Sequence, residues 1–265
     1  MLVSVLLAGV FIFGLRAYGE AKAYERTTAA LVAQMTPKAL AEFQAKEWAQ
    51  ILSLGLYKNK KRQELEVLKR ALSVHKANSM RMMAYSMVLM GIVLLSYFLL
   101  SLRAFTFFGA AGAGIMLLFG LYAPILMVTI HKEVAYLGDV VLSFESKGVL
   151  GSVEKLFANG DGVVAGVILL FSVLVPALKI LSMMFVSVFM KSRFAHRVVS
   201  FFKHLGKWSM VDVFVVATFL VYLTTNKGDV SRAEVEVGLY FFLAYVIVSM
   251  LVSLSADRML QREKG

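Results

Sequence analysis

Long apolar runs dominate this chain and limit the folds that are open to it. A helix needs about 20 residues to cross roughly 30 Å of hydrocarbon, and five runs are predicted to do so. They lie at residues 82–102, 106–130, 162–190, 211–225 and 238–254. A shorter apolar run, Met1–Leu15, opens the chain. Backbone groups inside a bilayer must bond to each other, and the alternating segments typical of barrels are absent. The sequence therefore predicts an all-α integral membrane protein with about six transmembrane helices.

The composition supports this class. Hydrophobic residues make up 59% of the 265 positions, charged residues only 17%, and the mean hydropathy is +0.75. A soluble protein of this length does not need so apolar a composition. The net charge of +11 is concentrated in a few connections, which is typical of loops that set membrane topology rather than of nucleic-acid binding.

No histidine or cysteine lies within the apolar runs. The chain has no cysteine, and its four histidines all lie outside the runs without the spacing of metal ligands. It has no Gly-x-x-x-x-Gly-Lys-Ser/Thr loop for nucleotide phosphates. The sequence therefore predicts no metal site, no cofactor and no enzymatic activity, and an intramembrane protease or acyltransferase is the least favoured interpretation.

The chain divides into five segments by composition. Residues 1–16 are predicted to form an uncleaved membrane anchor, because no Lys or Arg precedes the apolar run as in a secretory signal. Residues 17–80 are rich in Ala, Glu, Lys and Gln and predict two or three amphipathic helices outside the bilayer, with a break at the basic run Lys58–Arg62. The remaining segments are an additional transmembrane helix at 81–104, a four-helix membrane domain at 105–258 and a tail at 259–265.

Local patterns add detail to the membrane domain. The run Gly109-Ala-Ala-Gly-Ala-Gly114 gives its helix a face that a neighbouring helix can approach closely, for packing or, alternatively, for a substrate groove. Pro124, near the far end of the same run, is predicted to kink the helix. In the connection that follows, Asp139–Phe144 has a strand-like pattern and Ser152–Phe157 a helical one.

The basic connections predict the orientation. Arg103, the run Lys191–Lys207 and the C-terminal tail fall on one side of the membrane by helix parity, and the positive-inside rule makes this side cytoplasmic. The same parity places residues 17–80 outside the cytoplasm despite their many Lys and Arg, since segments of about 60 residues or more translocate largely regardless of charge. If Met1–Leu15 does not span the membrane, this region lies inside instead.

Two ionisable residues within apolar runs, Lys179 and Asp212, are the candidate functional groups. An ionisable group at membrane depth costs on the order of 2.5 to 3.5 kcal/mol on insertion scales. In one interpretation the two belong to a polar network for a lipid head group, and protonation of Asp212 couples lipid movement to the proton gradient. In the other, Asp212 orients the start of its helix and Lys179 extends its amine to the head groups. The hydroxyls available to complete a network are Ser172, Ser182, Ser209, Thr218 and Thr224.

Four blocks of residues resemble one known family in their order and spacing. They are Leu121-Tyr-Ala-Pro-Ile125, Ser172-Val-Leu-Val-Pro-Ala-Leu-Lys179, Gly206-Lys-Trp-Ser-Met-Val-Asp-Val-Phe214 and Asp257-Arg258. Over roughly residues 106–258 the chain resembles one four-helix unit of the paraquat-inducible protein A family of bacterial inner-membrane proteins. The motif positions are Pro124, Pro176, Trp208, Met210, Phe214, Asp257 and Arg258.

The resemblance implies a multi-pass subunit of the inner membrane, in a Gram-negative cell envelope, that transports phospholipid together with an oligomeric periplasmic MCE-domain protein. The alternative is a scaffold that anchors an MCE-type or envelope-stress partner without transporting lipid. Relatives often have two such units and cytoplasmic zinc ribbons with Cys-x-x-Cys pairs, whereas this chain has one unit and no cysteine. The zinc site of those relatives is therefore not expected here.

Overall fold

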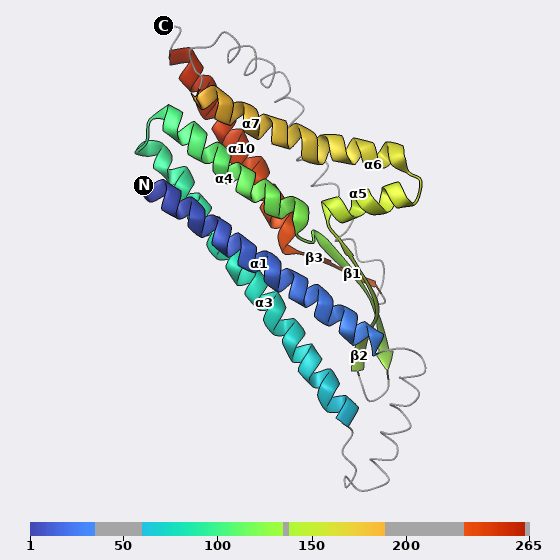
Figure 1. Ribbon diagram of the computed structural model, residues 1–265. Helices are drawn as coiled ribbons and strands as arrows, with labels where there is room; N and C mark the ends of the chain where they lie inside the picture. Colours follow the sequence, from blue (N-terminus) through green and yellow to red (C-terminus); the bar gives the residue numbers. More distant parts are fainter. Residues whose placement is uncertain (35–59, 135–137, 189–230, 263–265) are drawn as a thin grey trace, which may run out of the picture.

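The computed structural model of the chain is a bundle of long helices with a small β-sheet beside it (Figure 1). The structure describes residues 1–34, 60–134, 138–188 and 231–262. Their helices are α1 (Leu2–Ala33), α3 (Lys60–Leu95), α4 (Leu102–Tyr122), α5 (Val149–Ala158), α6 (Gly162–Leu169), α7 (Val175–Val188) and α10 (Val237–Arg262). Their strands are β1 (Leu126–Val134), β2 (Gly138–Lys147) and β3 (Ser231–Val235), and two short turns are the 3-10 turn η1 (Ser96–Phe98) and the π turn η2 (Leu170–Leu174).

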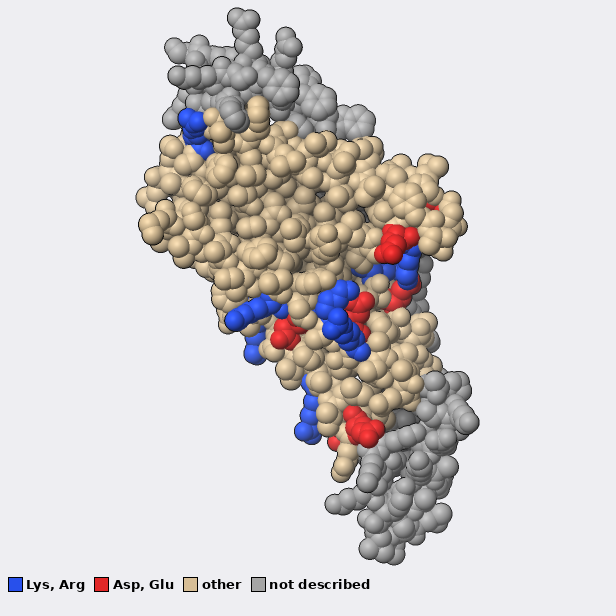
Figure 2. Space-filling view, viewed as in Figure 1, with Lys and Arg blue, Asp and Glu red and all other residues tan. Residues whose placement is uncertain are grey.

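Five helical segments of the described residues are long and apolar enough to cross a membrane. Figure 2 shows that the face over their upper part is almost free of charge, with basic side chains at its top and mixed charges below it. The helical membrane class predicted from the sequence is confirmed, while the predicted span 211–225 lies outside the described residues. The five segments are Leu2–Ala33, Gln63–Phe98, Leu102–Tyr122, Gly162–Val188 and Val237–Met259.

Helices α1 and α3 form a long antiparallel hairpin (Figure 1). The buried residues Val3, Leu7 and Val10 recur at helical spacing along α1 and line one face of it. Both helices are longer than the predicted segments: α1 continues far past residue 16, and α3 crosses residue 81 without interruption. The predicted segment boundaries at these two positions are therefore not helix ends. The start of α3 at Lys60 does lie within the basic run predicted as a break.

Helix α4 differs from its prediction at both ends. It begins at Leu102, where the Ser101 hydroxyl accepts an amide hydrogen of the first turn. The connection before it, residues 99–101, therefore lies earlier than expected. The helix ends at Tyr122, well before the predicted end, because Pro124 lacks an amide hydrogen and favours an extended conformation at Ala123. Pro124 therefore ends this helix and does not kink it. The last part of the apolar run forms strand β1 instead.

The three strands form an antiparallel sheet in the order β2-β1-β3. Leu126 of β1 lies opposite Lys147 of β2 on one side and opposite Val235 of β3 on the other. The strand predicted at Asp139–Phe144 is confirmed within β2, and the helix predicted at Ser152–Phe157 is confirmed within α5. The other two strands were not predicted, so the structure adds a sheet to the helical fold.

Small residues allow α4 and α10 to approach each other closely. A Cβ atom on Gly120 would lie 2.8 Å from the backbone of Phe242, and one on Gly109 would lie 2.6 Å from Cγ2 of Val252. Such distances leave no room for a side chain at these two positions. The small-residue face predicted for this helix therefore serves packing.

The helix ends gather on two sides. One end of the bundle holds Met1, the connection between η1 and α4, the end of α7 and the end of α10, and it is here named the C-terminal end (Figure 1). Arg103 joins two of these elements, because its guanidinium donates to the carbonyls of Ser187 and Val188 at 2.6 and 2.7 Å. The sheet, α5 and the last turns of α1 lie toward the opposite end, here named the sheet end. The connection before α4, the end of α7 and the end of α10 thus lie on the same side, as the predicted helix parity requires.

Candidate functional site

The predicted lysine is buried between two apolar helices. Lys179 lies in α7, is only 8% exposed, and its Nζ donates to the Oγ of Ser249 in α10 at 3.4 Å. Ser249 is itself buried and donates to the carbonyl of Val246 at 3.0 Å. The interpretation in which Lys179 extends its amine to the head groups is wrong for this structure, because the amine stays inside the bundle.

A change of helical register precedes Lys179. Helices α6 and α7 are continuous through the π turn η2, which contains Ser172. Pro176 is the second residue after the end of this turn. A proline inside a helix lacks the amide hydrogen that would bond four residues back, and its ring crowds that carbonyl. A π turn absorbs this conflict without breaking the helix, and such turns are frequent at functional sites. Pro176 thus rotates the half of the helix that carries Lys179 relative to the half before it.

Two of the predicted hydroxyls, those of Ser172 and Ser182, lie on the same helical segment as Lys179 but make no hydrogen bond to its amine. Ser172 is half-buried in the π turn, two helical turns before the lysine. Ser182 is also half-buried, but its hydroxyl donates back to the carbonyl of Leu178 at 2.6 Å. The remaining predicted network and motif residues lie outside the described residues, so the pairing of Lys179 with Asp212 stays a prediction. They are Ser209, Asp212, Thr218, Thr224, Trp208, Met210 and Phe214.

A second buried charge site was missed by the sequence analysis. Glu236, at the junction of β3 and α10, is 1% exposed, and neither carboxylate oxygen has a hydrogen-bond partner among the described residues. Burial raises the pKa of Glu236 to about 7; the nearby Lys76 amine opposes this rise, and the carboxylates of Glu234 and Glu25 add to it. A glutamate in an acidic connection between two apolar runs gives no local signal that it is buried.

A polar cluster surrounds this carboxylate and joins the hairpin to the sheet. The Lys76 amine of α3 forms an ion pair with Glu234 of β3 and lies 5.7 Å from the ring centre of Tyr24. The Tyr24 hydroxyl of α1 donates to Glu234 at 3.3 Å. Nearby, Nδ1 of His75 lies 2.7 Å from a carboxylate oxygen of Glu20. In the part of the chain that the structure describes, no three His, Cys, Asp or Glu side chains lie together so that they could hold a metal ion.

Comparison with known proteins identifies the family to which residues 106–262 are similar. The family described as paraquat-inducible protein A matches residues 106–262, more than half of the chain. This chain belongs to the paraquat-inducible protein A family. The matched region begins in α4 and ends with α10, so α1 and α3 lie outside the part that matches the paraquat-inducible protein A family.

Relatives in this family are named for intermembrane transport. The chain is 28% identical to intermembrane transport protein PqiA of Escherichia coli over 125 residues, which are 45% of this chain and 30% of that protein. It is 29% identical to a probable intermembrane transport protein of Haemophilus influenzae over 152 residues, 55% of this chain and 34% of the relative. The chain thus spans about a third of the length of these relatives. No solved structure matches the chain.

The predicted motif positions that the structure describes are Pro124, Pro176, Asp257 and Arg258. Pro124 and Pro176 determine the end of α4 and the π turn, as described above. Arg258 lies in the last turns of α10, within the helix rather than after it, and its Nη1 donates to the hydroxyl of Tyr97 at 2.9 Å. The preceding Asp257 accepts a hydrogen bond from the side chain of Gln261 at 3.2 Å.

Proposed function

We propose that this chain is an inner-membrane subunit that moves phospholipid between membranes together with a periplasmic MCE-domain protein. Membership of the family and the intermembrane transport named for its relatives support the proposal. The observation that carries it is the Lys179 amine, which is kept between two apolar helices and bonded to Ser249. A lipid that leaves its leaflet needs apolar walls for its chains and a polar group for its head, and a buried amine beside a hydroxyl supplies the latter.

In this proposal the C-terminal end lies in the cytoplasm and the sheet end in the periplasm. Arg103 and Arg258 at the C-terminal end favour this orientation under the positive-inside rule. The mixed charges of α1, α3 and the sheet below the apolar face offer a surface to a partner protein (Figure 2). Charged surfaces of this kind steer and orient protein partners.

Proton coupling is the finer part of the proposal. Protonation of Asp212 would remove a negative charge at membrane depth and so favour one of two helix arrangements. Asp212→Asn is therefore expected to abolish lipid transfer while the protein still folds and binds its partner. Lipid transfer that continues at the wild-type rate in this variant would reject proton coupling through Asp212.

The test of the proposal is purification of the full chain from native membranes, followed by mass spectrometry of the proteins and lipids that accompany it. We expect an MCE-domain protein and bound phospholipid with the wild type. Lys179→Met, which keeps the length of the side chain but not its charge, should lower the phospholipid bound per protein several-fold. Lys155→Met is the matched control, because Lys155 is exposed on α5 and pairs with Glu145 on the surface.

The outcomes separate transport from anchoring. A partner protein without phospholipid, in the wild type as well as in Lys179→Met, would reject lipid handling and favour the scaffold. Equal loss of lipid in Lys179→Met and Lys155→Met would show that the buried position of Lys179 has no special role. Loss of the partner in Lys179→Met alone would mean that the lysine serves assembly.

A further inference from the structure

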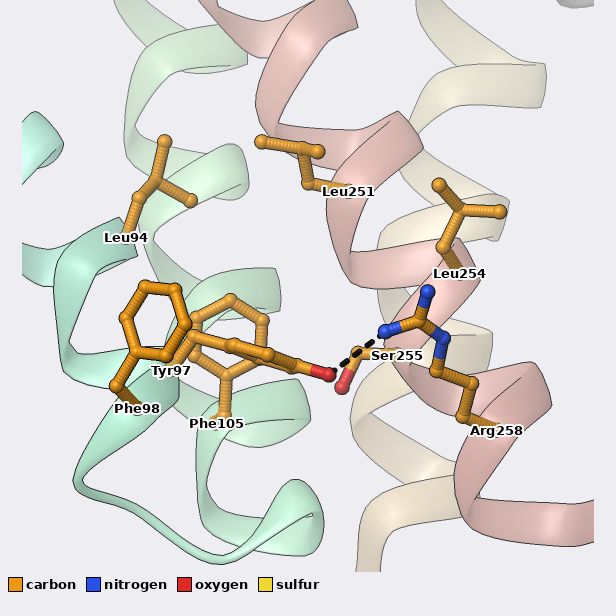
Figure 3. Close-up of a pocket in the computed structure, with 8 residues that line it drawn as sticks. All are labelled: Leu94, Tyr97, Phe98, Phe105, Leu251, Leu254, Ser255 and Arg258. Carbon is orange, nitrogen blue, oxygen red and sulfur yellow. Dashed lines mark hydrogen bonds between the residues drawn. The ribbon is translucent and has the colours of Figure 1, made fainter.

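A pocket opens at the C-terminal end of the bundle, between η1, the start of α4 and the last turns of α10. Its volume is about 230 Å³. Leu94, Phe105 and Leu251 form apolar walls, and Tyr97, Ser255 and Arg258 bring polar atoms to one side (Figure 3). Pockets that enclose whole drug-sized ligands measure roughly 300–1,000 Å³, so this one can hold only a part of a long amphiphile.

The polar side of the pocket suits an anion. Figure 3 shows the Arg258 guanidinium and the Tyr97 hydroxyl side by side, and the hydrogen bond between them measures 2.9 Å. A guanidinium has five N–H donors, so this bond leaves others for a phosphate. Among the described residues that line the pocket there is no carboxylate that would compete. The adjacent Asp257 bonds to Gln261 one helical turn further on.

The apolar side of the pocket faces the hydrocarbon. Phe98 and Leu254 line it and are 81% and 52% exposed, and Leu99 beside them is 88% exposed. Side chains this apolar and this exposed on membrane helices contact lipid tails. The apolar segment of α10 ends at Met259, so Arg258 lies at the level where head groups meet the hydrocarbon. A ligand here has its charge at the interface and its chain in the bilayer.

We propose that this pocket binds one phospholipid of the leaflet at the C-terminal end, with its phosphodiester on Arg258 and Tyr97 and the first part of an acyl chain against Phe105 and Leu251. The inference rests on the proposed function and names a place where lipid is taken up or released. Lys179 lies deeper in the bundle, so the pocket is a second position along the path of the lipid.

The experiment uses the full chain in nanodiscs of phosphatidylethanolamine that contain a trace of phosphatidylglycerol with a diazirine on its acyl chain. After illumination, mass spectrometry locates the labelled peptides. We expect labels on the peptides of η1, the start of α4 and the end of α10. Arg258→Gln, which removes the charge, should lower this labelling about tenfold, the usual effect of one charge-assisted hydrogen bond. Arg258→Lys should restore part of it.

Two further variants keep the test decisive. Arg103→Gln is the matched control, because Arg103 lies at the same end of the bundle but outside the residues that line the pocket, and its labelling should match the wild type. Leu251→Trp fills the pocket from its half-exposed wall while Arg258 is kept, and should abolish the pocket labels. Thermal unfolding of each variant confirms that it is folded.

Labels that map elsewhere, or that stay unchanged in Arg258→Gln and Leu251→Trp, would overturn the pocket assignment. The proposed function is judged separately, by the phospholipid that co-purifies with the wild type from native membranes. Bound phospholipid without pocket labels would reject the pocket and leave the proposed function standing. Absence of phospholipid from native preparations would reject the function itself, whatever the labels show in nanodiscs.

Discussion

Replacing Glu236 with glutamine should remove a pH dependence from the stability of this protein. The Glu236 carboxyl is 1% exposed and has no hydrogen-bond partner among the described residues, and burial raises its pKa from 4.5 to about 7. The folded protein therefore keeps this proton at pH values where the unfolded chain has lost it. The contribution of Glu236 to stability is therefore greatest below about pH 4.5 and falls as the pH rises toward 7. The pKa difference of about 2.5 corresponds to a loss of about 3 kcal/mol.

The assay is thermal unfolding in detergent micelles, followed by circular dichroism at about pH 5 and about pH 8. Glutamine stays neutral, so Glu236→Gln should be about 3 kcal/mol more stable than the wild type at the higher pH and within about 1 kcal/mol of it at the lower pH. Glu154→Gln is the control, since Glu154 is exposed on α5 and its change should affect neither condition. A variant that loses stability equally at both pH values would refute the argument, because it would mean that Glu236 is ionised and well solvated or paired in the folded protein.

Two further predictions concern helix packing, and both are read from the same thermal transitions. Gly120→Ala should lower the free energy of unfolding by about 1–3 kcal/mol, because the new Cβ would meet the backbone of α10. Gly114→Ala should be tolerated, because the new Cβ would lie at an ordinary 3.6 Å from a side-chain atom of α7. Equal effects of the two changes would contradict the close approach of α4 and α10. Ser86→Ala should cost about 1 kcal/mol, because it removes the buried hydrogen bond from α3 to the Val10 carbonyl. Ser73→Ala, at an exposed position of the same helix, should change stability by less than about 0.5 kcal/mol, and no difference between the two serine variants would argue against the bond between the helices.

The sequence alone predicted the membrane class and the positions of two of the described spans. The helical segment Gly162–Val188 lies inside its predicted run, and α10 begins one residue before the predicted start. The thickness of hydrocarbon and the need to pair backbone groups act on every residue of a span, so they leave a continuous signal. Helix α4 marks the limit of that signal. The first half of strand β1, residues 126–130, is as apolar as a membrane helix, and only Pro124 marks where the helix ends and the strand begins.

Contacts between distant segments were decided only by the tertiary structure. Nothing in the local sequence of β3 shows that it pairs with β1, and nothing near Ser249 shows that it receives a bond from Lys179. Glu236 looks like part of a solvated acidic connection until the sheet and the helices are seen to cover it. Whether a polar group is solvated, hydrogen-bonded or buried without a partner depends on which elements pack over it. That packing is a property of the whole fold, and residues a few positions away along the chain do not encode it.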